Sequence, residues 1–288
     1  MRSPIRLLAV SVAGITLVCA MPRGQQQAQA ISSEADQQQI LSRVRAYAER
    51  YVANLPNFVC DLETRQFQAG KKAKHWHKGD TLISRLTFNA GREEHTLEKV
   101  NDRPVRTQSR RLFQPLVTEG EFGMLMQGVF APASAAAFTW VGLENLEGRR
   151  VGVFQYAIDQ QHSNVSLSLD DTKKDYLPYH GSIYADPETG AIWRITSIPT
   201  DFPDELLTKS LSTVIDYDRV DIAGRDYLLP IAARVALETP TRNDRNELEF
   251  RNYRKFEAKS RITYASADDG GSGSADNLVG RPGAPPEE

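Results

Sequence analysis

The stretch Arg245-Asn246-Glu247-Leu248-Glu249-Phe250-Arg251 decides the fold. Its charged and apolar side chains alternate, so that Glu247 and Glu249 fall on one parity and Leu248 and Phe250 on the other. Alternation with period two is the pattern of a β-strand that has one face on water and one on a core. Since strands buried on a single face are typical of antiparallel sheets, the stretch predicts a sheet of that kind.

The same period recurs along most of the chain and predicts a series of strands joined by short turns. The predicted strands cover residues 58–67, 80–89, 93–100, 138–144, 150–159, 177–185, 191–198, 213–222, 226–237 and 245–264. Two turns are well marked: Asp186-Pro187-Glu188-Thr189-Gly190, and Ala223-Gly224-Arg225. Proline fixes one φ angle and glycine accepts a positive one, so both segments predict tight hairpins.

Two helices interrupt the strands. Residues 33–54 carry apolar side chains at helical spacing, Ser33 can cap the first turn, and Pro56 ends the pattern. Residues 119–130 form a second, shorter amphipathic segment that ends at Pro132. We therefore predict an α+β fold in which a large curved antiparallel sheet, a half-barrel, packs on two helices.

The domain organisation follows from the two ends of the chain. Residues 31–265 are predicted to form a single half-barrel-like domain, because no linker divides the strands. Residues 266–288 are rich in Gly, Ser, Asp and Pro, a composition that cannot bury enough apolar surface to order itself. They are predicted to be a disordered tail.

Several short phrases carry a resemblance to known proteins. They are Gly120-Glu121-Phe122-Gly123, Val129-Phe130-Ala131-Pro132, Tyr184-Ala185-Asp186-Pro187-Glu188-Thr189-Gly190, Tyr217-Asp218-Arg219-Val220-Asp221-Ile222 and Tyr227-Leu228-Leu229-Pro230. These phrases are similar to recurrent phrases of exported bacterial proteins of unknown function. The order of elements resembles that of the outer-membrane lipoprotein-sorting group, whose members are lipoprotein-carrier-like half-barrels. This resemblance implies a fold that holds acyl chains between its sheet and its helices.

The first thirty residues are typical of a secretory signal peptide. Arg2 and Arg6 precede the apolar run Leu7 to Met21, and Ala28-Gln29-Ala30 ends the segment with small residues. The run is shorter than the roughly 20 residues that cross a bilayer, so no transmembrane span is expected after cleavage. Cleavage after Ala20 is the alternative to cleavage after Ala30. Lipidation at Cys19 is disfavoured because the bulky Val18 precedes it. The protein is expected to be exported, to the periplasm or beyond the cell.

Composition and cysteine content exclude some classes of partner and chemistry. The net charge of −2 gives no reason to expect binding to nucleic acid. Signal cleavage leaves Cys60 as the remaining cysteine, so no disulfide forms within the mature chain. Cys60 lies on the apolar parity of its strand, which favours a buried packing role over a reactive thiol.

Titratable residues offer three candidate sites, each with a structural alternative. His75 and His77, with His95, are candidates for a metal site, although lysines surround the pair as in a solvated basic turn. Carboxylates at Asp170-Asp171 and at Asp216, Asp218 and Asp221 are candidates for calcium binding or acid–base chemistry, or form the outer face of a strand.

His180 is the third candidate, as a member of a dispersed Ser/His/Asp site. No Gly-x-Ser-x-Gly elbow occurs between a strand and a helix, so the sequence gives no catalytic motif. We expect no catalytic residue, no resident metal and no cofactor.

Aromatic and aliphatic side chains of several strands are candidates to line an apolar groove. The candidate ligand-lining residues are Phe138, Trp140, Phe154, Tyr156, Ile158, Tyr227, Leu229 and Ile231. If the helices cover these side chains completely, they only form part of the hydrophobic core. If the helices leave some of them exposed, these side chains line a groove that contacts a ligand.

These observations favour an exported non-catalytic protein that binds an apolar ligand, a lipid or lipoprotein, or an envelope partner. The alternatives are an exported hydrolase with a dispersed active site and a protein-interaction module without a ligand cavity. The hydrolase predicts that His75, His77 or His180 clusters with carboxylates in a pocket. The interaction module predicts a closed core and an exposed sheet edge.

Overall fold

The computed structural model describes residues 33–73, 75–105, 123–170 and 173–256, which all belong to one compact unit of the chain. The predicted signal peptide and tail, Asp171 and the first part of the predicted second helix lie outside these residues. The two predicted boundaries of the domain, residues 31 and 265, therefore stay predictions.

Helix α1 (Glu34–Tyr51) begins at the predicted cap and continues into a short 3-10 turn, η1 (Val52–Asn54). The hydroxyl of Ser33 accepts a hydrogen bond from the backbone N–H of Asp36 at 3.1 Å. This bond satisfies one of the donors that the first turn of a helix leaves free. Helix α2 (Met124–Phe130) is followed by a second 3-10 turn, η3 (Pro132–Ser134), that begins at the predicted breaker Pro132.

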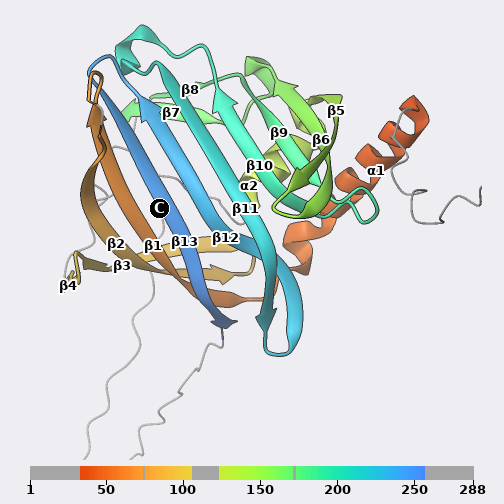
Figure 1. Ribbon diagram of the computed structural model, residues 1–288, viewed down its shortest axis with the longest axis horizontal. Helices are drawn as coiled ribbons and strands as arrows, with labels where there is room; N and C mark the ends of the chain where they lie inside the picture. Colours follow the sequence, from red (N-terminus) through yellow and green to blue (C-terminus); the bar gives the residue numbers. More distant parts are fainter. Residues whose placement is uncertain (1–32, 74, 106–122, 171–172, 257–288) are drawn as a thin grey trace, which may run out of the picture. The chain divides into compact units, whose positions relative to one another are not determined.

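Among the described residues, the ten predicted strands and one further short strand form one antiparallel sheet of 11 strands (Figure 1). Their bounds differ from the predicted ones in both directions: the strand predicted over 58–67 extends to Gly70, whereas the strand predicted over 245–264 ends at Lys255. The strands are β1 (Phe58–Gly70), β2 (His77–Asn89), β3 (Arg92–Val100), β4 (Arg103–Pro104), β5 (Ala137–Leu146), β6 (Arg149–Ile158), β9 (Tyr179–Ala185), β10 (Ile192–Pro199), β11 (Ser210–Ile222), β12 (Arg225–Glu238) and β13 (Arg242–Lys255). A separate two-stranded sheet, β7 (Ser166–Asp170) with β8 (Lys173–Tyr176), was not predicted. Two further 3-10 turns among the described residues are η4 (Gln160–His162) and η5 (Asp204–Leu206).

The order of strands is β4-β3-β2-β1-β13-β12-β11-β10-β9-β6-β5, so the last strand lies between the first strand and β12. Figure 1 shows that the sheet curves, as predicted, with β13 beside β1 near its middle. Pairs such as Leu62 with Phe250 join residues that are far apart in the sequence. The α+β class and the large curved antiparallel sheet are confirmed.

Alternate side chains of the strands define two faces of the sheet. On one face, which we call the helix-covered face, buried residues of β1, β6, β9, β10 and β13 join one core cluster with α1 and α2. Helix α1 contributes the predicted stripe, and α2 contributes Met126 and Val129; the members of the stripe are Ile40, Leu41, Val44, Ala48 and Tyr51. The opposite face, the outer face, carries the charged parity of β13 that the sequence indicated.

Helix α1 is fixed to the turn between β9 and β10. Gly190 in this turn has φ +76°, and a Cβ built on it would lie 2.4 Å from the backbone of Arg43. The guanidinium of Arg43 donates a hydrogen bond of 2.9 Å to the carbonyl oxygen of Pro187. The predicted hairpin turn therefore also holds the helix, and only a residue without a side chain allows this approach.

Candidate functional site

Half-buried aromatic side chains gather where α1, α2 and β5 meet, and we call Phe130, Phe138, Trp140 and Arg45 the aromatic seam. The rings of Phe130 and Phe138 stack with centroids 5.3 Å apart, and the guanidinium carbon of Arg45 lies 5.1 Å from the Phe138 centroid. Phe130, Phe138 and Trp140 pack against the core but are only partly buried. The seam is thus an apolar surface of the helix-covered face that water still reaches.

The ring of Trp140 rests on the backbone of β6. A Cβ at Gly152 would lie 2.9 Å from the ring, and Ile40 of α1 comes within 3.7 Å of the same point. Trp140 also meets Phe154 edge-on at 4.9 Å between centroids, a favourable geometry for aromatic pairs. The small residue in β6 therefore lets the indole lie against the strand beside α1.

The structure divides the predicted ligand-lining residues into three groups. Four of them are fully enclosed in the core cluster: Phe154, Tyr156, Ile158 and Leu229. Phe138, Trp140 and Tyr227 are partly buried against it. Leu229 and Ile231 were predicted to share one face, but the register of β11 and β12 shifts at a bulge between Asp216 and Tyr217. Ile231 is therefore not enclosed in the core, and its side chain lines a groove whose charged residues lie on the outer face.

Buried phenols anchor the core through hydrogen bonds to carbonyl oxygens. The Tyr156 hydroxyl donates to the carbonyl of Thr196 at 2.7 Å, and the Tyr51 hydroxyl donates to that of Leu228 at 2.9 Å. Burial raises the pKa of both phenols, so they remain protonated donors over the physiological range. These hydroxyls serve to satisfy buried carbonyl groups and to fix the rings.

The three histidines proposed as metal ligands do not come together. His77 lies opposite Gln68 at one end of β2, whereas His95 lies opposite Leu86 near the other, roughly 30 Å away at about 3.3 Å per residue. His75 and His77 are exposed, and His95 lies 3.8 Å from Glu93. Within the described ranges, no group of three or more His, Cys, Asp or Glu side chains is placed to hold a metal ion.

The proposed carboxylate cluster of β11 is divided among separate partners. Asp216 pairs with Arg194, and Asp218 accepts two hydrogen bonds of 2.8 Å from Arg149. Asp221 accepts a bond from the N–H of Gly224 and closes the hairpin turn. The three carboxylates of β11 thus contact two different arginines and a turn, and they do not form one cluster. Asp170, of the other predicted pair, is the last residue of strand β7.

His180 lies at a hollow of about 510 Å³ on the sheet. The lining residues are Ala137, Thr139, Gln155, Tyr156, Ala157, His180, Gly181, Ser182, Thr196 and Ile198. None of these lining residues is a carboxylate, so the cluster that the hydrolase alternative predicts does not form around this histidine.

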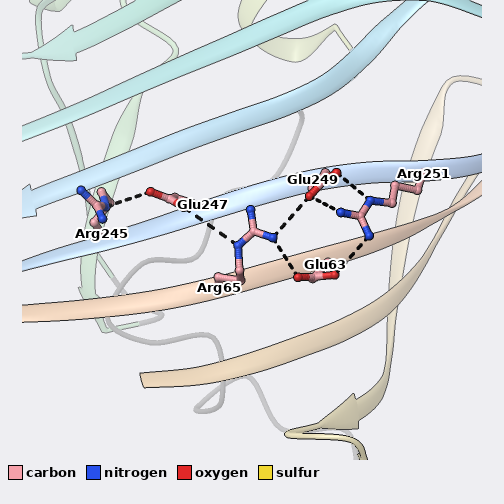
Figure 2. A network of polar contacts seen from close by, with 6 residues as sticks. All are labelled: Glu63, Arg65, Arg245, Glu247, Glu249 and Arg251. Carbon is pink, nitrogen blue, oxygen red and sulfur yellow. Dashed lines mark hydrogen bonds and ion pairs between the residues drawn. The ribbon is translucent and has the colours of Figure 1, made fainter. Parts of the chain in front are cut away.

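A network of six charged side chains crosses β1 and β13 on the outer face (Figure 2). Arg65 contacts Glu63 at 3.0 Å, Glu249 at 3.3 Å and Glu247 at 3.9 Å, and Figure 2 shows its guanidinium between the three carboxylates. Arg251 and Arg245 extend the network at its two ends. The hydrogen bond from Arg251 lowers the pKa of Glu249. Sequence parity placed Glu247 and Glu249 on this face but did not reveal their partners.

Comparisons with known proteins give distant structural likenesses. No protein-family model matches the chain, and no curated protein matches its sequence. A DUF1329 family protein from Desulfovibrio piger ATCC 29098 is similar at a TM-score of 0.40 and 10% identity, over 79% of this chain and 96% of that one. An outer membrane lipoprotein-sorting protein domain from Vibrio parahaemolyticus is similar at a TM-score of 0.38 and 9% identity, over 76% of this chain and 92% of that one.

These likenesses confirm the predicted resemblance to the lipoprotein-sorting group as a distant one. They carry no ligand or activity to this chain. Among the described residues, no helix combines the length and apolar character that a membrane crossing requires.

Proposed function

We propose that this chain is an exported, non-catalytic binding protein that holds an apolar ligand, an acyl chain of a lipid or lipoprotein, at the aromatic seam. The observation that supports this proposal is the partial exposure of three large aromatic rings, from α2 and β5, beside a closed core. Covering exposed apolar surface contributes about 25 cal/mol per Å², so an acyl chain laid along these rings gains affinity from each methylene.

The seam suits a flexible chain better than a rigid polar ligand. Its rings come from β5, the edge strand of the sheet, and from the short helix α2, so two elements present one apolar surface. Arg45 adds a cation above Phe138 and forms no ion pair with a described residue. A ligand with an apolar body thus meets rings below and a charged group at their rim.

Native mass spectrometry tests the proposal most directly. The full chain is expressed in a bacterial host, purified from the exported fraction without detergent, and examined for a co-purifying lipid mass. We expect an adduct that organic extraction removes. Edman sequencing of the same sample locates the mature N-terminus, which we expect to follow Ala30 or Ala20.

A fluorescent fatty acid, dansyl-undecanoic acid, then probes the emptied protein. We expect saturable binding that Phe138→Gln weakens by about tenfold, whereas Trp76→Gln, at an exposed tryptophan outside the seam, leaves it unchanged. Phe130→Gln serves as a second seam variant if the first unfolds. Equal binding by seam and control variants, or no adduct and no probe binding in the parent, would show that the proposal is wrong.

A second candidate function rests on the free edge of β5. Among the described strands, β5 pairs with β6 alone and ends the sheet, and Val141 on it is 49% exposed. An extended segment of an envelope protein can add to such an edge through backbone hydrogen bonds. Val141→Pro would remove a backbone donor from this edge, so it should abolish binding of such a segment and leave binding of the fluorescent fatty acid unchanged.

A further inference from the structure

The connection between β1 and β2 gathers basic side chains and an exposed indole at one end of the sheet. We call it the basic hairpin, and its described members are Lys71, Lys72, His75, Trp76, His77 and Lys78. Every described residue from 72 to 79 is exposed. The histidines of the hairpin do not meet His95, so the predicted metal site does not explain this stretch.

The basic hairpin carries more positive than negative charge. Residues 71–80 contain four lysines and one carboxylate, that of Asp80. Glu238 pairs with Lys71 at the base of the hairpin, which leaves a surplus of two positive charges with the histidines counted as neutral. Lys72 and Lys78 are exposed and form no ion pair with a described residue. The surplus charge therefore faces solvent.

The acidic side chains of a neighbouring connection are too distant to cancel this charge. Residues 200–209 join β10 to β11 and carry Asp201, Asp204 and Glu205. In the order β1-β13-β12-β11, three spacings of about 4.8 Å separate β1 from β11, so these carboxylates lie roughly 14 Å or more from the hairpin along the sheet. This separation exceeds the Debye length of about 8 Å at physiological salt, so the hairpin presents a positive surface of its own.

Trp76 adds an apolar group that the sheet holds in place. The guanidinium carbon of Arg245 lies 4.5 Å from the centroid of the Trp76 ring and 4.8 Å from that of Phe67. These contacts fix the indole beside the lysines, yet 40% of Trp76 stays exposed. Tryptophan is enriched where the apolar interior of a membrane meets the lipid headgroups, because its ring is apolar and its N–H is polar.

We infer that the basic hairpin binds the surface of a membrane that contains anionic phospholipids, with Lys72 and Lys78 at the phosphate groups and the indole of Trp76 among the headgroups. Each lysine close to an anionic leaflet strengthens binding about fivefold. The exposed part of the indole adds the removal of apolar surface from water. A soluble polyanion would complement the lysines but would offer no apolar layer to the indole, so the pair of features fits a lipid surface better.

This contact goes beyond the proposed apolar ligand and does not depend on it. The basic hairpin joins β1 and β2, whereas the aromatic seam is built on β5 at the far edge of the sheet. Phe138→Gln should weaken binding of the fatty acid and leave membrane binding unchanged, and Trp76→Gln should do the reverse. Failure of either proposal therefore leaves the other standing.

Flotation of the purified exported protein with lipid vesicles tests the inference. The vesicles consist of phosphatidylcholine alone or of phosphatidylcholine mixed with phosphatidylglycerol. We expect binding to the mixed vesicles that weakens as salt is raised, and little binding to phosphatidylcholine alone. The double variant Lys72→Gln/Lys78→Gln should bind about 25-fold more weakly, as the product of two fivefold losses. Trp76→Gln should bind about tenfold more weakly.

Two control variants remove the same kinds of side chain elsewhere. Arg92→Gln/Lys99→Gln removes two exposed positive charges from β3, and Tyr176→Gln removes a ring that is 47% exposed on β8. Both should bind like the parent, and melting curves that match the parent show that the variants fold.

Four results would overturn the inference. The first two are no vesicle binding by the parent and binding that does not require phosphatidylglycerol. The third is an equal loss of binding in the hairpin and control double variants. The fourth is full binding by Trp76→Gln while the lysine variant fails, because the hairpin would then recognise negative charge alone.

Discussion

Cys60 lies on the helix-covered face of β1 with no exposed surface. Burial raises the pKa of its thiol to about 12, although a hydrogen bond with Tyr253 acts in the opposite direction. Since the thiolate is the reactive species, the native protein should not react at Cys60 with iodoacetamide at pH 8 within an hour. Peptide mass spectrometry should find the residue unmodified before, and fully alkylated after, unfolding in guanidinium; rapid native labelling would refute its packing role.

Asp218 provides a test of the ion pairs at the scale of one residue. Burial acts to raise the pKa of this carboxyl, but hydrogen bonds from Arg149 and from the N–H of Arg219 hold it below its ordinary value of 3.8. A lowered folded pKa stabilises the protein above the unfolded pKa, and this contribution is lost as pH falls through the folded value. Asp218→Asn should therefore lower the free energy of unfolding at pH 7 and converge with the parent near pH 2.

The expected size of that effect is below about 1 kcal/mol, because the pair is partly exposed and screened by solvent. Urea unfolding at pH 7 and pH 2 measures it. Asp226→Asn, at an exposed carboxylate on strand β12 of the same hairpin, is the control and should leave the free energy of unfolding unchanged at both pH values. A difference that persists unchanged at pH 2 would mean that packing, and not charge, explains the effect.

At the scale of the elements, the turn that holds α1 makes a clear prediction. Gly190→Ala forces a side chain into a positive φ and against the backbone of Arg43, so it should destabilise the protein by about 3 kcal/mol or more. Gly224→Ala shares the positive φ but meets no atom within 4 Å, and should cost about 1 kcal/mol. Urea unfolding compares the two, and equal losses would show that contact with α1 adds nothing.

Most elements could be predicted from sequence because their cause is local. Ser33 and Pro56 mark the ends of the first helix, and period two marks β13, since capping and alternation depend on near neighbours. The bulge that places Ile231 and Leu229 on different surfaces could not be predicted from the sequence of one strand. It depends on how β11 and β12 pair with each other. The partners of Asp216 and Arg65 likewise lie on other strands, so a single strand pattern cannot name them.

The whole molecule depends on a pairing that no local pattern indicates. Strand β13 lies between β1 and β12, so it joins the part of the sheet formed by β1 to β4 to the part formed by β5, β6 and β9 to β12. The aromatic seam also arises at this scale, because it combines side chains of α1, α2 and β5. Sequence parity indicated its residue types, whereas the packing of the two helices on the sheet determines which of them meet.

This topology predicts that the last strand is required for folding of the entire sheet. A chain that ends at Thr241 lacks β13 and leaves the facing edges of β1 and β12 unpaired, and it also loses the buried side chains of Leu248 and Phe250. We expect such a chain to aggregate and to lose cooperative unfolding, since unpaired edges invite association. A chain that ends at Ala265 keeps every described strand and should melt within about 2 °C of the full chain. Calorimetry and size-exclusion chromatography of the two truncations decide the matter, because a folded monomer ending at Thr241 would contradict the role of β13 in joining the sheet.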